Sequence, residues 1–103
     1  MYKIFLVEDD RALADTLAQM LSERDFEVYC VRDFRQIPAE FDAFQPQLVL
    51  MDLMLPFDNG YHWCAELRKR SDIPIVFLSS ESLKLTEQPV VAISMAFLIP
   101  YLM

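Results

Sequence analysis

The sequence predicts a doubly wound α/β fold, in which helices cover both faces of a parallel β-sheet. Two short apolar runs, residues 4–7 and 48–51, are each followed at once by acidic residues. Runs of this length suit strands that are buried on both faces, and the segments around them are helical in composition. Strands that alternate with helices imply right-handed crossovers and a parallel sheet. We therefore expect both acidic clusters at the carboxyl edge of the sheet, where such folds bind ligands.

The first part of the chain supplies two strands and a helix. Residues 3–7 form the first strand, and Asp10 can cap a helix that runs to about Arg24. One face of that helix carries four apolar side chains, Leu13, Leu17, Met20 and Leu21. Residues 27–31 form the second strand.

The middle of the chain continues the same alternation. Residues 33–44 are helical in composition, but Pro38 is tolerated mainly in a first helical turn, so this helix is short or begins late. Residues 48–51 form the third strand, a third helix covers about residues 60–70, and residues 75–78 form the fourth strand. The buried stripe of the third helix consists of Trp63, Cys64 and Leu67.

The composition of the chain changes after Glu87, because no charged residue follows it. Pro89 can open a short fourth helix, because proline is compatible with a first helical turn. Residues 97–99 can then form a fifth strand.

Composition limits the classes of protein to consider. With 103 residues, of which 54% are hydrophobic, the chain is expected to be one ordered domain. Nine basic against 16 acidic residues give a net charge of -7, which disfavours direct binding of nucleic acid. We find no secretory leader and no stretch that could span a bilayer, so we expect a cytoplasmic protein without membrane insertion. Cys30 and Cys64 do not have the spacing that is typical of metal or redox sites. We expect both to be reduced and to serve in packing.

The acids Glu8, Asp9 and Asp52 would converge if their strands are neighbours. Two unit charges about 5 Å apart repel by roughly 3 kcal/mol at an effective dielectric constant of about 20, a cost that a divalent cation reverses. Carboxylate oxygens suit Mg²⁺, which usually adds a phosphate to its ligands. Asp52 is then a candidate nucleophile that forms an aspartyl phosphate, and Ser79 can hydrogen-bond that phosphate. Taken singly, Asp10 suits a helix cap and Ser79 a loop hydroxyl.

With these motifs, the chain resembles the receiver domains of bacterial two-component response regulators. Four signatures occur in order: the acidic pair after the first strand, Asp52 within an Asp-x-x-Leu-Pro sequence, Asn59 and Gly60 where the family usually has Asp-Gly, and a hydroxyl residue after the fourth strand. The resemblance implies a flavodoxin-like fold with strand order 2-1-3-4-5. Residues 60–64 and 75–80 are similar to regulators that answer cell-envelope or peptide-antibiotic stress.

The resemblance also implies roles for the site residues. Asp52 would accept a phosphoryl group from a sensor histidine kinase, and Ser79 would be the switch hydroxyl. Mg²⁺ would be bound by Asp52, by Asp9 directly, by Glu8 largely through water, and by the main-chain carbonyl of Met54. Such a domain is not an enzyme beyond its own phosphotransfer and dephosphorylation.

The chain departs from the family pattern near its end. Within a single domain of residues 1–103, residues 1–82 match the pattern and residues 83–103 diverge from it. Ile99 stands where the family has a lysine that would contact the phosphoryl group, and we expect residues 1–103 to lack the fifth helix that would cover one face of the sheet. Uncovered apolar faces usually mark interfaces, so we expect a homodimer formed through the C-terminal region. The alternative function is a receiver-like interaction or dimerisation module that works without phosphorylation.

Overall fold

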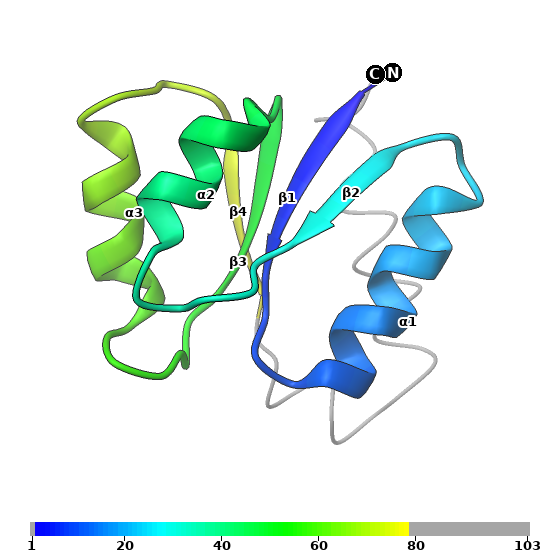
Figure 1. The fold of residues 1–103 in the computed structure, drawn as a ribbon, viewed down its shortest axis with the longest axis horizontal. Coiled ribbons are helices and arrows are strands. Elements are labelled where there is room, and N and C mark those ends of the chain that lie inside the picture. Colours follow the sequence, from blue (N-terminus) through cyan, green and yellow to red (C-terminus); the bar gives the residue numbers. More distant parts are fainter. Residues whose placement is uncertain (1, 79–103) are drawn as a thin grey trace.

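The computed structural model describes residues 2–78, which form a four-stranded parallel sheet with helices on both faces (Figure 1). In chain order the elements are β1 (Lys3–Val7), α1 (Arg11–Ser22), β2 (Glu27–Cys30), α2 (Ile37–Phe44), β3 (Leu48–Asp52), α3 (Gly60–Arg68) and β4 (Ile75–Leu78). The predicted doubly wound α/β fold is confirmed. The expected fourth helix and fifth strand lie outside the described residues, and so do Ser79 and Ile99. Within residues 2–78, no helix has the length and apolar character needed to cross a bilayer.

The strand order is β2-β1-β3-β4, and all neighbouring strands are parallel. This order agrees with the first four strands of the expected 2-1-3-4-5 arrangement. In the register of the sheet, Val7 of β1 lies opposite Met51 of β3, and Asp52 lies opposite Leu78 of β4. The residues that follow Val7 and the last residue of β3 therefore reach the same edge of the sheet.

Alternate side chains of the central strands belong to two separate apolar clusters. Ile4 and Leu6 pack with residues of α1 on one face. Phe5 and Val7 pack with residues of α2 and α3 on the opposite face. Strands that are buried on both faces need apolar side chains at consecutive positions, which explains the continuous apolar runs in the sequence.

α1 starts where it was predicted to start and ends two residues before its approximate predicted end. Oδ1 of Asp10 accepts a hydrogen bond from the backbone N of Leu13 at 3.1 Å and so caps the helix. The helix ends at Ser22 rather than at Arg24, and Asp25 then adopts a positive φ of 68° on the way to β2. Aspartate tolerates this conformation better than most residues because its short polar side chain hydrogen-bonds locally.

The elements in the middle of the chain differ from their predicted bounds by small amounts. α2 begins at Ile37 with Pro38 in its first turn, in agreement with the predicted late start, because proline lacks the N–H that later turns require. β2 ends at Cys30, one residue earlier than predicted. β3 runs one residue further than predicted and includes Asp52. This carboxylate is therefore carried by a paired strand rather than by a loop.

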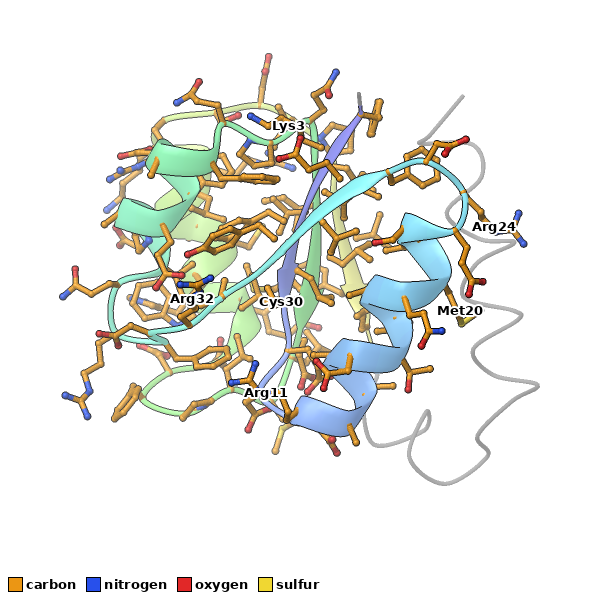
Figure 2. The ribbon with its side chains drawn as sticks, turned by 45° about the vertical axis from the view of Figure 1, so that its right-hand side comes forward. Lys3, Arg11, Met20, Arg24, Cys30 and Arg32 are labelled. Atoms are coloured by element: carbon orange, nitrogen blue, oxygen red, sulfur yellow. The ribbon has the colours of Figure 1, made fainter. Side chains whose placement is uncertain are left out.

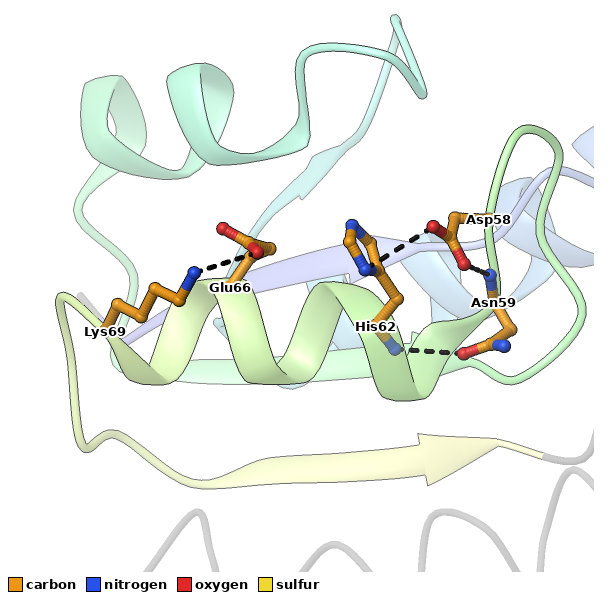
Figure 3. A network of polar contacts seen from close by, with 5 residues as sticks. All are labelled: Asp58, Asn59, His62, Glu66 and Lys69. Carbon is orange, nitrogen blue, oxygen red and sulfur yellow. Dashed lines mark hydrogen bonds and ion pairs between the residues drawn. The ribbon is translucent and has the colours of Figure 1, made fainter.

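Polar contacts hold the start and the exposed side of α3 (Figure 3). Oδ1 of Asn59 accepts a hydrogen bond from the backbone N of His62 at 2.9 Å and caps the helix. Oδ1 of Asp58 accepts one from the backbone N of Asn59 at 2.8 Å, while its Oδ2 lies 3.4 Å from Nδ1 of His62. At the end of the helix, Nζ of Lys69, the residue after Arg68, pairs with Oε1 of Glu66 at 3.1 Å. The contacts of Asp58 and Asn59 with the first turn of the helix anchor the loop that leads from β3 into α3.

The apolar side of α3 is narrower than predicted. Leu67 is buried as expected, whereas Trp63 and Cys64 are only partly buried. The helix also ends at Arg68, two residues earlier than predicted. Its single buried leucine packs in the same cluster as Phe5 of β1.

Candidate functional site

Three of the predicted site residues meet at the carboxyl edge of the sheet. Glu8 and Asp9 follow β1, and Asp52 ends the neighbouring strand β3. One carboxylate oxygen from each of these residues lies within 4.8 Å of the other two. Over residues 2–78, no other group of three His, Cys, Asp or Glu side chains is arranged in this way.

The three carboxylates differ in their exposure to solvent. Glu8 is 4% exposed and Asp52 is 0% exposed, whereas Asp9 is an exposed residue. Acidic side chains are rarely buried to this extent without a compensating partner, because burial removes the water that solvates their charge. The cluster thus combines two acids set into the protein with one acid that faces solvent.

Glu8 shows the electrostatic consequence of this arrangement. Its Oε2 accepts a hydrogen bond from the backbone N of Asp10 at 2.9 Å, and its buried Oε1 accepts none from the described residues. Burial is the largest cause that raises the pKa of Glu8 to about 8, and the hydrogen bond from Asp10 opposes this rise. The charge of Asp52, a hydrogen bond between Glu8 and Asp52, and the charge of Asp9 raise the pKa further. At neutral pH the carboxyl group therefore keeps its proton unless a cation takes the proton's place.

The chain that follows β3 orients the carboxylate of Asp52. Oδ1 of Asp52 accepts a hydrogen bond from the backbone N of Met54 at 3.1 Å. The side chain of Met54 is largely in solvent, being 71% exposed, so this residue contributes its backbone to the site rather than apolar packing. The hydrogen bond keeps the main chain of Met54 close to the carboxylate cluster.

Gly60 allows α3 to start directly against the end of β3. A Cβ atom at this position would lie 2.3 Å from the carbonyl oxygen of Asp52, and the backbone N of Gly60 donates to the carbonyl of Leu53 at 3.0 Å. Only glycine permits two backbones to approach so closely. The sequence predicted a turn here but not this contact; the available signal was that Gly60 is the single glycine among 103 residues.

The donor atoms of the cluster fit a hard divalent cation. Carboxylate oxygens are ligands that Mg²⁺ accepts, and the buried Oε1 of Glu8 accepts no hydrogen bond from the described residues. A cation would also remove the repulsion among three like charges. Two further expected groups stay predictions. They are the main-chain carbonyl of Met54 and the hydroxyl of Ser79, a residue that lies outside the described ones.

With this fold and this acidic edge, the chain belongs to the family of response regulator receiver domains. The model of that family, described as the response regulator receiver domain, matches residues 4–98. The resemblance inferred from the sequence motifs is therefore confirmed. The chain is a receiver domain of two-component phosphorelay signalling.

Similar curated proteins carry names from the same family. The sensory transduction protein BceR of Bacillus subtilis is 42% identical over 80 residues, which are 78% of this chain and 35% of BceR. The response regulator protein GraR of Staphylococcus epidermidis is 42% identical over 78 residues, which are 76% of this chain and 35% of GraR. The chain thus spans about a third of the length of these relatives, 35% in both cases.

Solved structures of receiver domains are also similar. The N-terminal domain of the nisin resistance regulator NsrR, described as a lantibiotic response regulator, is 47% identical with a TM-score of 0.70 over 75% of this chain and 65% of that one. The BeF3-activated receiver domain of RstA from Klebsiella pneumoniae is 28% identical with a TM-score of 0.73 over 93% and 96% of the two chains. Both likenesses support the flavodoxin-like fold.

Proposed function

We propose that this chain is the phosphate-accepting part of a response regulator, in which Asp52 receives a phosphoryl group from a sensor histidine kinase. The observation that carries the proposal is the cluster of Glu8, Asp9 and Asp52, with one carboxylate oxygen of each within 4.8 Å of the others. Two of these acids are buried, which is costly unless the site has a further, positively charged component. Mg²⁺ is the proposed component, bound by the three carboxylates and by the main-chain carbonyl of Met54.

The chemistry is a displacement at phosphorus. A carboxylate oxygen of Asp52 forms a bond to phosphorus while the bond from phosphorus to the kinase imidazole nitrogen breaks, and the imidazole leaves with that electron pair. Bound Mg²⁺ supplies positive charge to the transferring oxygens. The backbone N of Met54 holds Oδ1 of Asp52 and so fixes the orientation of the nucleophile. The hydroxyl of Ser79 is proposed to hydrogen-bond the phosphoryl group once it is on Asp52.

Intact-mass measurement after incubation with Mg²⁺ and acetyl phosphate tests the proposal. We expect the mass to rise by one phosphoryl group, and the gain to disappear in Asp52→Asn and after chelation of the metal. Asp72→Asn is the matched control, because Asp72 is an exposed acid in the loop before β4. An adduct that persists in Asp52→Asn, or no adduct with either acetyl phosphate or a phosphorylated kinase, would refute the assignment.

The sequence departure at Ile99 supports a second candidate function, a module that binds partners or dimerises without phosphorylation. The expected lysine would contact the phosphoryl group, so its absence would weaken the link between phosphorylation and signalling. Light scattering at micromolar concentration tests the proposed homodimer. If Asp52→Asn dimerises as the unmodified chain does, and phosphorylation leaves the dimer fraction unchanged, the second function is favoured over the first.

The relatives also suggest the signalling context. We propose that the chain belongs to a regulator of the response to peptide antibiotics, because it is 47% identical to the N-terminal domain of NsrR, a nisin resistance regulator. Loss of the gene should lower the nisin concentration that stops growth, and the unmodified gene should restore it. Complementation by Asp52→Asn should fail if the phosphorylation proposal is also correct, whereas unchanged nisin sensitivity after deletion would contradict the assigned context.

A further inference from the structure

A small cavity of about 50 Å³ lies next to the acidic cluster, between the start of α1 and the residues that follow β2. Its polar lining comes from Glu8, Asp9, Arg11, Cys30 and Arg32. The nucleophile proposed above, Asp52, does not line it. The volume exceeds what a single water molecule needs. The cavity is thus a compartment beside the metal carboxylates and separate from the phosphate-accepting position.

Two arginines give this cavity its positive charge, one at the start of α1 and the other in the segment after β2 (Figure 2). Arg11 is the first residue of α1, where the helix adds the partial positive charge of its N-terminus. The charge of Arg11 also acts on the Cys30 thiol in the cavity lining. Burial and the charge of Asp15 raise the pKa of this thiol, whereas the charge of Arg11 lowers it.

Arg32 is held in place from two sides. Its backbone N donates a hydrogen bond to Oε1 of Glu40 at 2.9 Å, and its guanidinium carbon lies 5.9 Å from the ring centroid of Tyr29. Glu40 also accepts hydrogen bonds from the backbone N of Asp33 at 2.8 Å and from the hydroxyl of Tyr29 at 2.9 Å. The carboxylate of Glu40 in α2 therefore holds the backbone of the segment that carries Arg32, while the side chain of Arg32 itself is exposed.

The negative charges around the cavity determine when it can attract an anion. Glu8 and Asp9 belong to the same lining, and Asp15 lies near Cys30. Without a bound metal, the carboxylate of Asp9 in the lining opposes the attraction of the two arginines for an anion. A divalent cation bound by Glu8, Asp9 and Asp52 would offset most of their negative charge, so Arg11 and Arg32 would attract an anion more strongly.

We propose that the cavity is an oxyanion subsite, strengthened by metal binding, that draws the phosphate group of a phosphodonor toward Asp52. The biological role of this subsite rests on the proposed function, whereas its existence does not. A tetrahedral dianion approaching a chain with a net charge of -7 meets repulsion over most of the surface. Arg11 and Arg32 provide local attraction at the edge where transfer takes place, and guanidinium groups match the geometry of phosphate oxygens.

Sulfate is the probe for the subsite itself. Backbone amide shifts of the full chain are followed by NMR while sodium sulfate replaces sodium chloride at constant ionic strength, with and without Mg²⁺. We expect saturable shifts at residues 10–11 and 30–32, with tighter binding when Mg²⁺ is present. Arg11→Gln and Arg32→Gln should each weaken sulfate binding about threefold or more, the usual size of one exposed charge interaction. Arg24→Gln, which removes an exposed charge beyond the far end of α1, should leave it unchanged.

The outcomes separate this inference from the function on which it rests. Asp52→Asn should lose phosphorylation and still bind sulfate. Shifts that do not saturate, or that Arg24→Gln reduces as much as Arg11→Gln does, would show an adventitious ion only and overturn the subsite. With acetyl phosphate as donor, the two cavity variants should raise the half-saturating concentration about threefold at unchanged maximal rate. A protein that binds sulfate in the expected way but takes no phosphoryl group would retain the subsite and lose the proposed function.

Discussion

The two edges of the sheet differ in the surroundings of their charged side chains. At the amino edge, Nζ of Lys3 donates to the carbonyl of Phe44 at 2.7 Å and lies 4.8 Å from the centroid of the Phe44 ring. The backbone N of Lys3 also donates to the side chain of Gln47 at 2.9 Å. At the carboxyl edge, the acidic side chains of Glu8 and Asp52 are buried beside each other. The charged group at the amino edge thus has its partners within the chain. The acidic groups at the carboxyl edge instead favour the binding of a cation from outside it.

This difference separates groups that stabilise the fold from groups that serve a site. Like charges placed together in a buried position destabilise the folded chain, so a stable fold alone would not select them. Lys3, in contrast, has its partners within the same domain. The comparison predicts that changes at the carboxyl edge alter metal and pH dependence, whereas changes at the amino edge alter stability alone.

The largest effect should be a pH dependence that originates in Glu8. Its pKa is raised from the usual 4.5 to about 8, so the folded chain binds this proton more tightly than the unfolded chain does. The resulting contribution to stability is present in full below about pH 4.5 and is lost as pH rises toward about 8. Between pH 5 and 8 in a chelating buffer, the free energy of unfolding should fall by an amount on the order of a few kcal/mol relative to Glu8→Gln.

Urea denaturation of both proteins at several pH values provides the measurement. Glu8→Gln is the appropriate reference because it keeps the shape of the side chain and cannot titrate. A difference between the two proteins that stays constant with pH would show that Glu8 is not the source. The amino-edge variant Lys3→Met should follow the pH profile of the unmodified chain.

The next largest effect should come from Gly60→Ala. The added Cβ atom would lie 2.3 Å from the carbonyl oxygen of Asp52, so either β3 or α3 has to move. Overpacking of this kind costs roughly 1–3 kcal/mol. Because the shift occurs at Asp52, the affinity for Mg²⁺ should fall as well. Ala65→Ser, at an exposed position of the same helix, should change stability by about 0.5 kcal/mol or less.

Mg²⁺ should stabilise the unmodified chain by a smaller, defined amount. At a concentration tenfold above its dissociation constant, a ligand that binds only the folded state contributes roughly 1.4 kcal/mol. Thermal unfolding at pH 7.5 with and without Mg²⁺ measures this gain, and Asp9→Asn should reduce it. An equal gain in Asp9→Asn would argue that the cation binds elsewhere.

The smallest effect should come from the amino edge. Lys3→Met removes the hydrogen bond to the carbonyl of Phe44 and the contact with its ring, and should cost about 1 kcal/mol. The gain in stability on adding Mg²⁺ should remain the same as in the unmodified chain. If this variant loses the response to Mg²⁺, the two edges are coupled and the contrast between them fails.

Local rules account for most of what the sequence predicted about the fold. The two central strands were expected within one residue of their bounds, because burial on both faces demands continuous apolar runs. Asp10 was expected to cap α1 and Pro38 to delay α2, since both depend on hydrogen bonds within one turn. The ends of α1 and α3 were placed too far along the chain, because they depend on where the chain must turn back toward the sheet.

The sequence by itself determined which chemical groups are available: the acids after the apolar runs, the order of the motifs, and thereby the family. Only the tertiary structure decided how those groups behave. Glu8 and Asp9 are adjacent in sequence, yet Glu8 is buried with a pKa raised to about 8 and Asp9 is exposed. The physical reason is that solvation and charge interactions depend on neighbours from distant parts of the chain, here Asp52, which only the register of β1 and β3 brings close.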